Sequence, residues 1–420
     1  MYDPAQTLPH DVLALIADQL ASENFGFSPD TATLRALSQT CKFMVAVCRR
    51  YLFAEIRLDC CSEVHYKTLM DLLREKIETA SYVRELYYAV QEVPDKHLDG
   101  ILEALLGHSI FLRHIYFERS MGQWSKQPES IQRVLTSLIQ LPTVTCLRLS
   151  DIQDFPVNHI SLCGGLKILS LTRITDFALH DVSSFPAGWT VPTPLSLEIM
   201  TADSFGGLAI IMGTDNGPNA LAPIVDFGRL QHAHFDMQSD PAAVNQVCKI
   251  LKTAQQLKSI KLNVDDKTDA VRLSSLGPVL AAHTPSTLTS ITIESEVEWR
   301  ENETTLWGLD KVLQDMAGRN VLAWLDLFIV ITTGDQMQQF MDLGDLLDLD
   351  RVLTEPGAFP ALRSVAFELR WNIFCAGYYF EDDEDDDEDD FVDHGRVTRE
   401  DFPRLCDFPG VKFSFSESDD

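Results

Sequence analysis

The chain has 420 residues, of which 45% are hydrophobic, so it is long enough to bury a large core. Aspartate and glutamate together number 63 against 34 lysines and arginines, which gives a formal net charge of −29. A surface of this charge repels phosphate backbones and anionic lipid, so the composition argues against general nucleic-acid or membrane-surface binding.

The nine cysteines have no regular spacing, and no Cys-x-x-Cys pair occurs. This pattern indicates reduced thiols, as in a cytoplasmic or nuclear protein, rather than a disulfide framework. The first residues show no basic segment followed by an apolar one, so no secretory signal is expected. The most apolar stretch, Val321 to Ile331, is interrupted by Asp326 and is about half the length needed to cross a bilayer, so we predict a buried strand there.

The N-terminal segment has the pattern of amphipathic helices. Pro9 suits a first helical position, and Asp11 lies where the helix dipole favours a negative charge. Apolar residues then recur at helical spacing at Val12, Leu13, Ile16 and Leu20. After a polar interruption, a second apolar face follows at Leu34, Leu37, Cys41, Met44 and Val45, and it continues with Leu52, Phe53 and Ile56.

From about residue 60, short runs repeat one pattern: an apolar residue, two variable residues, an apolar, a variable and an apolar. They begin at Val83, Leu112, Val144, Leu166, Leu195, Leu230, Leu257, Leu288, Leu322 and Leu362. Helix-compatible stretches such as Ala242 to Leu251 and Leu276 to Ala282 lie between them. The spacing of about 20 to 40 residues predicts a strand–helix solenoid, and an ordinary parallel α/β sheet is the alternative.

These patterns divide the chain into four parts. We predict a helical module over residues 1–60, a solenoid over 61–380 with a possible insertion at 186–223, an acidic disordered loop over 381–395, and a last strand and tail over 396–420. The unbroken acidic run Glu381 to Asp390 has nothing apolar to bury. It is either a solvated insertion or an electrostatic lure for a basic partner.

Few residues suggest chemistry. His232 and His234 lie two apart on a predicted strand and would face the same side, so they are either a metal pair or, as we prefer, polar residues of the strand face. Cys60 and Cys61 are adjacent and are either oxidation-sensitive or ordinary buried thiols. Neither a phosphate-binding loop nor a nucleophile elbow occurs. We therefore expect no enzyme activity, no cofactor and no metal.

Residues 8–58 resemble the F-box in the version common among fungal proteins. The family's opening positions are filled by Leu8, Pro9, Asp11, Val12, Leu13, Ile16 and Leu20. Its second half is matched by Leu34, Leu37, Ser38, Thr40, Cys41, Lys42, Arg49, Leu52, Phe53, Ile56 and Leu58. Met44 stands where the family usually has tryptophan, and the link Ala21 to Thr33 is longer than usual. The later strand runs resemble leucine-rich repeats.

This resemblance implies a fold and a function. The fold would be α/β, with F-box helices followed by an irregular leucine-rich-repeat-like solenoid. The protein would be the substrate-recognition subunit of a Skp-cullin-F-box type ubiquitin ligase, binding a Skp-type adaptor, through it a cullin, and an unknown protein substrate. The adaptor-binding residues would be Leu8, Pro9, Val12, Leu13, Ile16, Leu20, Leu34 and Leu37. Three alternatives remain: the helices only cap the solenoid, the protein is a non-catalytic scaffold with no role in ubiquitin transfer, or it is a hydrolase or transferase on an α/β fold.

Overall fold

The structure, a computed structural model, divides into two compact units, residues 1–195 and 196–420. It describes residues 9–22, 31–58, 62–91, 93–119, 123–174, 177–178, 194–203, 208, 211–213, 223–237, 241–265, 273–298, 308–334, 344–374 and 398–419. Leu8, Cys60, Cys61, most of the possible insertion at 186–223 and the acidic run at 381–390 lie outside the described residues.

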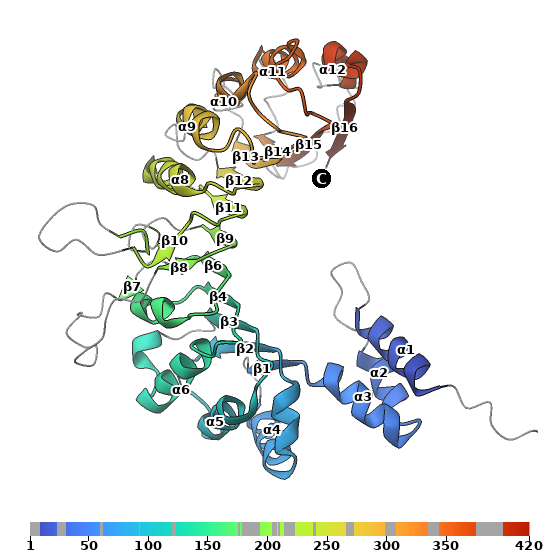
Figure 1. Cartoon of the computed structure of the whole chain (residues 1–420), viewed down its shortest axis with the longest axis vertical. Coiled ribbons are helices and arrows are strands. Elements are labelled where there is room, and N and C mark those ends of the chain that lie inside the picture. Colours follow the sequence, from blue (N-terminus) through green and yellow to red (C-terminus); the bar gives the residue numbers. More distant parts are fainter. Residues whose placement is uncertain are drawn as a thin grey trace, which may run out of the picture. The chain divides into compact units, whose positions relative to one another are not determined.

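The protein belongs to the α/β class, as the sequence predicts. Its main feature is a large parallel sheet of twelve strands in the order β1-β2-β3-β4-β6-β9-β11-β12-β13-β14-β15-β16. The first five strands of this order belong to the first unit and the other seven to the second. Two further sheets, β5-β7 and β8-β10, have two short strands each. Because neighbours in a parallel sheet need crossover connections, helices alternate with strands along the chain (Figure 1).

The first unit begins with three helices and continues with strands and helices in alternation. Its helices are α1 (His10–Ser22), α2 (Thr31–Ser38), α3 (Lys42–Leu52), α4 (Glu63–Glu75), α5 (Leu98–His108) and α6 (Glu129–Ile139), with 3₁₀ turns η1 (Ile77–Tyr82), η2 (Trp124–Lys126) and η3 (Val157–Leu162). Its strands are β1 (Glu55–Leu58), β2 (Glu85–Val90), β3 (His114–Arg119), β4 (Cys146–Ser150), β5 (Phe155–Pro156), β6 (Ile168–Thr172) and β7 (Phe177–Ala178); β8 (Leu195–Ser196) lies at the unit boundary.

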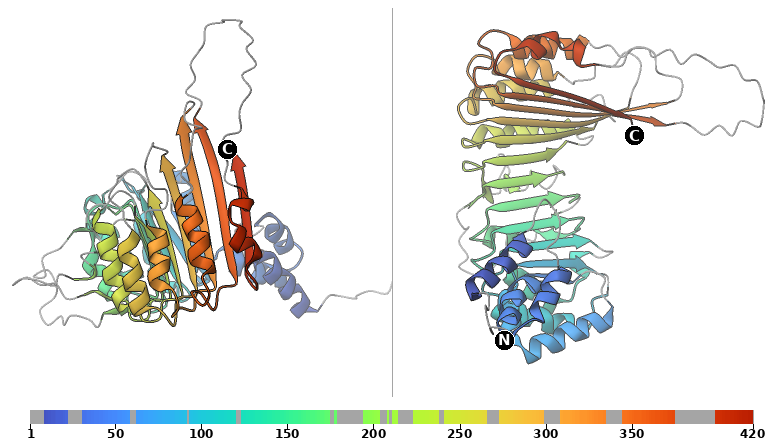
Figure 2. Two further views of the ribbon diagram at one scale, coloured as in Figure 1. Left: turned by 90° about the horizontal axis from the view of Figure 1, so that it is seen from above. Right: turned by 90° about the vertical axis from the view of Figure 1, so that its right-hand side faces the viewer.

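The second unit has longer strands towards its C-terminal end (Figure 2). Its strands are β9 (Ile199–Ala202), β10 (Val225–Asp226), β11 (His232–Asp236), β12 (Ser259–Asp265), β13 (Ser290–Glu298), β14 (Trp324–Gly334), β15 (Ser364–Phe374) and β16 (Lys412–Asp419). Its helices are α8 (Pro241–Thr253), α9 (Leu276–His283), α10 (Leu309–Met316), α11 (Gly344–Thr354) and α12 (Pro403–Asp407), with 3₁₀ turns η5 (Leu273–Ser275) and η6 (Arg399–Asp401).

In both units the repeated sequence pattern aligns in register and forms the core. In the first unit, one row of paired and buried residues is Ile56, Leu86, Ile115, Leu147 and Leu169. In the second unit, the corresponding row is Met200, Ala233, Ile260, Ile291, Leu325, Val365 and Phe413. These residues alternate with outward-facing ones, so each strand buries one face against the helix layer.

The strand predictions are confirmed, with two differences. Each of the ten repeated runs contains strand residues, but the run that begins at Leu195 is split between β8 and β9. Glu55–Leu58 forms strand β1, which pairs with β2, so the last part of the predicted helical module belongs to the sheet. The pattern of Leu52, Phe53 and Ile56 is too short to separate a helix end from a new strand, and pairing with β2 decides it.

Buried polar residues fix two connections of the second unit. Asp350 on α11 is buried, and its carboxylate accepts hydrogen bonds from the backbone N–H groups of Arg404 (3.2 Å) and Leu405 (2.8 Å), which holds the start of α12. Asn320 is also buried and donates through Nδ2 to the carbonyls of Met316 (2.8 Å) and Ala358 (2.9 Å). Such bonds are costly to break because they leave buried partners unsatisfied.

The predicted buried strand at Val321 to Ile331 is confirmed from Trp324 onward as the first part of β14, with Leu325, Leu327 and Ile329 buried, whereas Val321 to Ala323 precede the strand. In the part of the chain that the structure describes, no helix is both long and apolar enough to span a membrane.

Candidate protein-interaction surfaces

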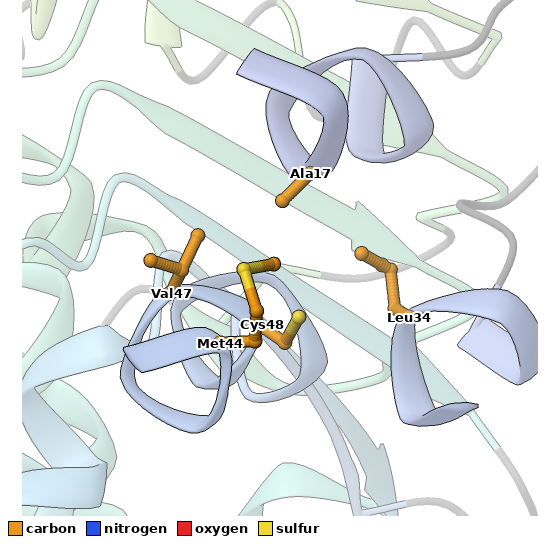
Figure 3. Packing of buried hydrophobic residues seen from close by; sticks show 5 residues of the cluster. All are labelled: Ala17, Leu34, Met44, Val47 and Cys48. Carbon is orange, nitrogen blue, oxygen red and sulfur yellow. The ribbon is translucent and has the colours of Figure 1, made fainter. Parts of the chain in front are cut away.

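Helices α1, α2 and α3 share a small hydrophobic core of their own. Its buried members are Ala17, Leu34, Met44, Val47 and Cys48, whose side chains point toward one another from the three helices (Figure 3). Half-buried apolar residues pack around them: Leu13, Ala14, Leu20, Ala21, Leu37, Phe43, Tyr51 and Leu52. Met44, where the F-box usually has tryptophan, is fully buried in this core.

Polar and aromatic contacts hold α1 against α3. The ring of His10 stacks on Phe43 with centroids 4.1 Å apart, and the Tyr51 hydroxyl donates a hydrogen bond to the Asp18 carboxylate. The backbone N–H groups of Val12 and Leu13 donate to the Pro9 carbonyl, so Pro9 directly precedes the first helical residue, His10, and lies one position earlier than predicted. These contacts fix which side of α1 faces inward.

The other side of α1 carries an exposed apolar stripe of Val12, Leu15 and Ile16, which we call the α1 stripe. Their exposed fractions are 38%, 65% and 39%. Residues three and four apart are neighbours on a helix surface, so the three side chains form one patch. None of the three side chains belongs to the core that α1, α2 and α3 share.

The seven described residues among the predicted adaptor-binding set are exposed, half-buried or fully buried. Val12 and Ile16 are exposed in the α1 stripe, and Pro9 is exposed at the start of α1. Leu13, Leu20 and Leu37 are half-buried around the core, and Leu34 is fully buried in it, whereas Leu8 is outside the described residues.

Leu15 is the most exposed member of the stripe and is not among the adaptor-binding residues predicted from the sequence. Its spacing from Val12 is the signal that could have identified it.

The strands of the first unit also present a face that does not pack against α4–α6; we call it the first open face. Here Tyr87 and Tyr116 stack with centroids 4.2 Å apart and planes 6° from parallel. Arg57 lies over the Tyr87 ring at 4.3 Å, and Arg148 lies over the Tyr116 ring at 5.3 Å. The result is an arginine–tyrosine–tyrosine–arginine ladder across four strands.

The charges beside this ladder are paired as well. Glu85 accepts from His114 Nδ1 at 3.3 Å and from the Tyr87 hydroxyl at 3.4 Å, and Arg57 pairs with Glu55. The hydrogen bond from His114 lowers the pKa of the Glu85 carboxyl, while burial and the nearby Glu85 raise the pKa of Tyr116. Ring and charge contacts thus connect most of the polar groups of the first open face.

The second unit has a corresponding face, opposite α8–α12, which we call the second open face (Figure 2). Two ion pairs lie on it. Lys261 on β12 pairs with Glu294 on β13 at 2.6 Å, and Arg370 pairs with Glu368 on the same strand, β15, at 3.4 Å. Arg370 also lies 5.1 Å from the centroid of the Phe328 ring. Trp324 is 44% exposed on β14, and Asp326 follows two residues later on the same side.

His232 and His234 lie on β11 and both point away from the buried row, as predicted. His232 Nδ1 is 2.7 Å from Ser259 Oγ, and burial together with the nearby Lys261 lowers the pKa of His234. Among the described residues, no three side chains of histidine, cysteine, aspartate or glutamate are grouped as metal ligands. Both histidines thus lie on the outward face of β11, as their spacing of two predicts.

Comparison with protein-family models and with curated proteins finds no match for this sequence. The surfaces of the chain are therefore interpreted from their own geometry.

Proposed function

We propose that this protein is the substrate-recognition subunit of a Skp-cullin-F-box type ubiquitin ligase. Helices α1–α3 would bind the Skp-type adaptor, and the strand–helix region, interpreted as a leucine-rich-repeat-like solenoid, would bind a protein substrate. The observation that carries the proposal is the α1 stripe of Val12, Leu15 and Ile16, which is exposed on a module that already has its own core.

The energetics favour a partner for this stripe. The inner side of α1 supplies Ala17 to the core, whereas Val12, Leu15 and Ile16 on the outer side are not members of that core. Apolar side chains that move from water into an interface contribute about 25 cal/mol per Å² of buried apolar area. Central anchors of interfaces commonly contribute about 2 kcal/mol or more each. A helix with one face in its own core and an apolar second face is suited to packing against partner helices.

The parallel strands support the second half of the proposal. Among the described elements, a helix or 3₁₀ turn directly follows each of the strands β1–β3 and β11–β15, and adjacent strands of each unit align the same apolar positions. This is the arrangement expected of stacked strand–helix repeats. The protein would then contribute no catalytic group of its own and would act by raising the local concentration of substrate near the conjugating enzyme.

The test is a double substitution in the stripe, Leu15→Gln with Ile16→Gln, made in the full chain and co-expressed with a Skp-type adaptor. Glutamine keeps helix propensity close to that of leucine, so the circular dichroism should stay near wild type. We expect adaptor co-purification to fall at least about tenfold. The matched control is Val64→Gln on α4, which is 71% exposed in the same unit but outside α1–α3.

Equal adaptor binding by the double variant and by the control would refute adaptor docking through α1. If the adaptor binds but no cullin joins the complex, the scaffold alternative is correct instead.

A further inference from the structure

Trp324 and Asp326 stand side by side on an inner strand of the second unit. They are two residues apart on β14, so both side chains point to the second open face, while Leu325 between them is buried. β14 pairs with β13 on one side and with β15 on the other. Inner strands of a sheet are held on both edges, so the positions of these two residues are fixed by the ladder.

The neighbours of the pair are too small to cover it. Ser290 and Ser364 are in register with Trp324, and Thr292 and Ala366 are in register with Asp326. None of the four is charged. Within the described residues, the indole of Trp324 has no ring contact or hydrogen bond. A large aromatic side chain is therefore presented next to a carboxylate, with short side chains on both sides.

Asp326 is a half-buried carboxylate with no cation beside it. Burial raises the pKa of its carboxyl above the ordinary value, and no described residue forms an ion pair with it. The nearby cations Lys261 and Arg370 already pair with Glu294 and Glu368. A partly buried charge without a partner costs free energy, and a cation from outside would remove that cost.

The next outward position on β14, Phe328, has the cation that Trp324 and Asp326 lack. Phe328 is two residues beyond Asp326 on β14, and the Arg370 guanidinium lies 5.1 Å from its ring centroid while pairing with Glu368. At this position Arg370 contacts both an aromatic ring, Phe328, and a carboxylate, Glu368. At Trp324 and Asp326 the aromatic ring and the carboxylate are present, and the described residues provide no cation between them.

The charge of the surrounding face fits a basic occupant. Among the side chains that the structure describes, its outward carboxylates are Asp236, Glu294, Glu296, Asp326 and Glu368, and its outward cations are Lys261, Arg370 and Lys412. The whole chain carries −29. Such a face repels nucleic-acid phosphates and anionic lipid and attracts cationic peptide.

We propose that the second open face binds an extended basic segment of a partner protein, with one lysine or arginine side chain held between the Trp324 ring and the Asp326 carboxylate. Side chains two apart on a strand are about 7 Å apart, so one guanidinium can lie on the ring and still reach the carboxylate. An extended peptide can place a further cation toward Glu296, which lies one strand away on β13. This binding does not depend on the adaptor.

The test uses the full chain and a fluorescein-labelled octapeptide of alternating arginine and serine, followed by fluorescence anisotropy. The matched peptide carries citrulline, which has the shape of arginine without its charge. We expect Asp326→Asn to weaken binding of the arginine peptide about tenfold and Trp324→Ala to weaken it by a similar factor. Trp324→Phe should retain part of the affinity, since a phenyl ring is a weaker cation–π partner.

The control is Asp315→Asn on α10, an exposed position in the helix layer of the same unit that makes the same change of net charge. Its affinity for the arginine peptide should stay within about twofold of wild type. If Asp326→Asn behaves like this control, if the citrulline peptide binds as well as the arginine peptide, or if a single-stranded oligonucleotide competes with it at the same face, the proposal is wrong. Adaptor binding by the same variants should stay unchanged, so failure here is distinct from failure of the proposed ubiquitin-ligase role.

Discussion

The two open faces are built from the same kind of parallel strands, but they differ in how their side chains are paired. On the first, Tyr87 and Tyr116 stack on each other and each ring has an arginine over it. On the second, Trp324 and Asp326 have no such partner among the described residues. Side chains that satisfy one another stabilise the fold, whereas an exposed indole beside an unpaired carboxylate costs stability and indicates a ligand.

This difference predicts opposite responses to removing the central aromatic ring of each face. Tyr116→Ala should lower the free energy of unfolding by about 2 kcal/mol, because it removes the stack on Tyr87, the contact with Arg148 and half-buried apolar area. Trp324→Ala removes a larger side chain but should cost at most about 1 kcal/mol. Urea unfolding followed by circular dichroism measures both, and an equal or larger cost at Trp324 would remove the distinction between the faces.

A smaller effect is expected at the end of the ladder. Arg148→Ala should cost about 0.5–1 kcal/mol, because the guanidinium loses its position over the Tyr116 ring. The control is Arg133→Ala on α6, an exposed arginine for which the structure shows no ring contact. Thermal unfolding of the two variants side by side measures the difference. Equal midpoints would show that the arginine adds nothing to the ladder.

The Glu85 carboxylate, on the first open face, should stabilise the fold at neutral pH. The His114 hydrogen bond lowers the pKa of Glu85 below its ordinary value of 4.5, and Tyr87 and Arg57 lower it further. Glu55 is in register with Glu85 on β1 and pairs with Arg57. The stabilisation is therefore present above pH 4.5 and is lost as the pH falls through the lowered value. Glu85→Gln should lower the free energy of unfolding at pH 7, measured by thermal unfolding, by less than about 1 kcal/mol because the group is partly exposed. A variant as stable as wild type at pH 7 would contradict this.

The ionised carboxylate of Asp326, on the second open face, should lower the stability of the fold, which is the opposite of the effect expected for Glu85. Burial raises the pKa of Asp326 above 3.8, so the folded state binds the proton more tightly than the unfolded chain does. Wild type therefore loses stability as the pH rises from about 3.8 through the raised value. Asp326→Asn should unfold at a higher temperature than wild type at pH 7, and the gap should close below pH 3.8. Lower stability of the variant at pH 7 would mean that Asp326 has a structural partner and is not poised for a ligand.

The repeated pattern of apolar residues determined much of the architecture. The alternation in each run predicts strands of the large sheet, namely β2, β3, β4, β6, β9 and β11 to β15, whereas the short strands β5, β7 and β10 lie outside the runs. The α/β class follows from the alternation of these runs with helical stretches. The helical spacing of Val12, Leu13 and Ile16 predicts α1 in the same way. Such predictions succeed because burial of one face requires a fixed period along the chain, and that period is visible in the sequence.

The spacing of apolar residues along the chain did not by itself determine the candidate sites, because tertiary packing decides which of these residues are exposed. A helical repeat shows that Val12, Leu13 and Ile16 are close together, but packing against α2 and α3 turned Leu13 inward and left Val12, Leu15 and Ile16 outside. Strand β1 was decided by its pairing with β2.

Alternation placed Trp324 and Asp326 on one face of a strand, yet their neighbours come from segments about 35 to 40 residues away along the chain, at Ser290, Thr292, Ser364 and Ala366. Whether a carboxylate finds a cation depends on what the adjacent strands present at the same register, and only the assembled sheet determines that.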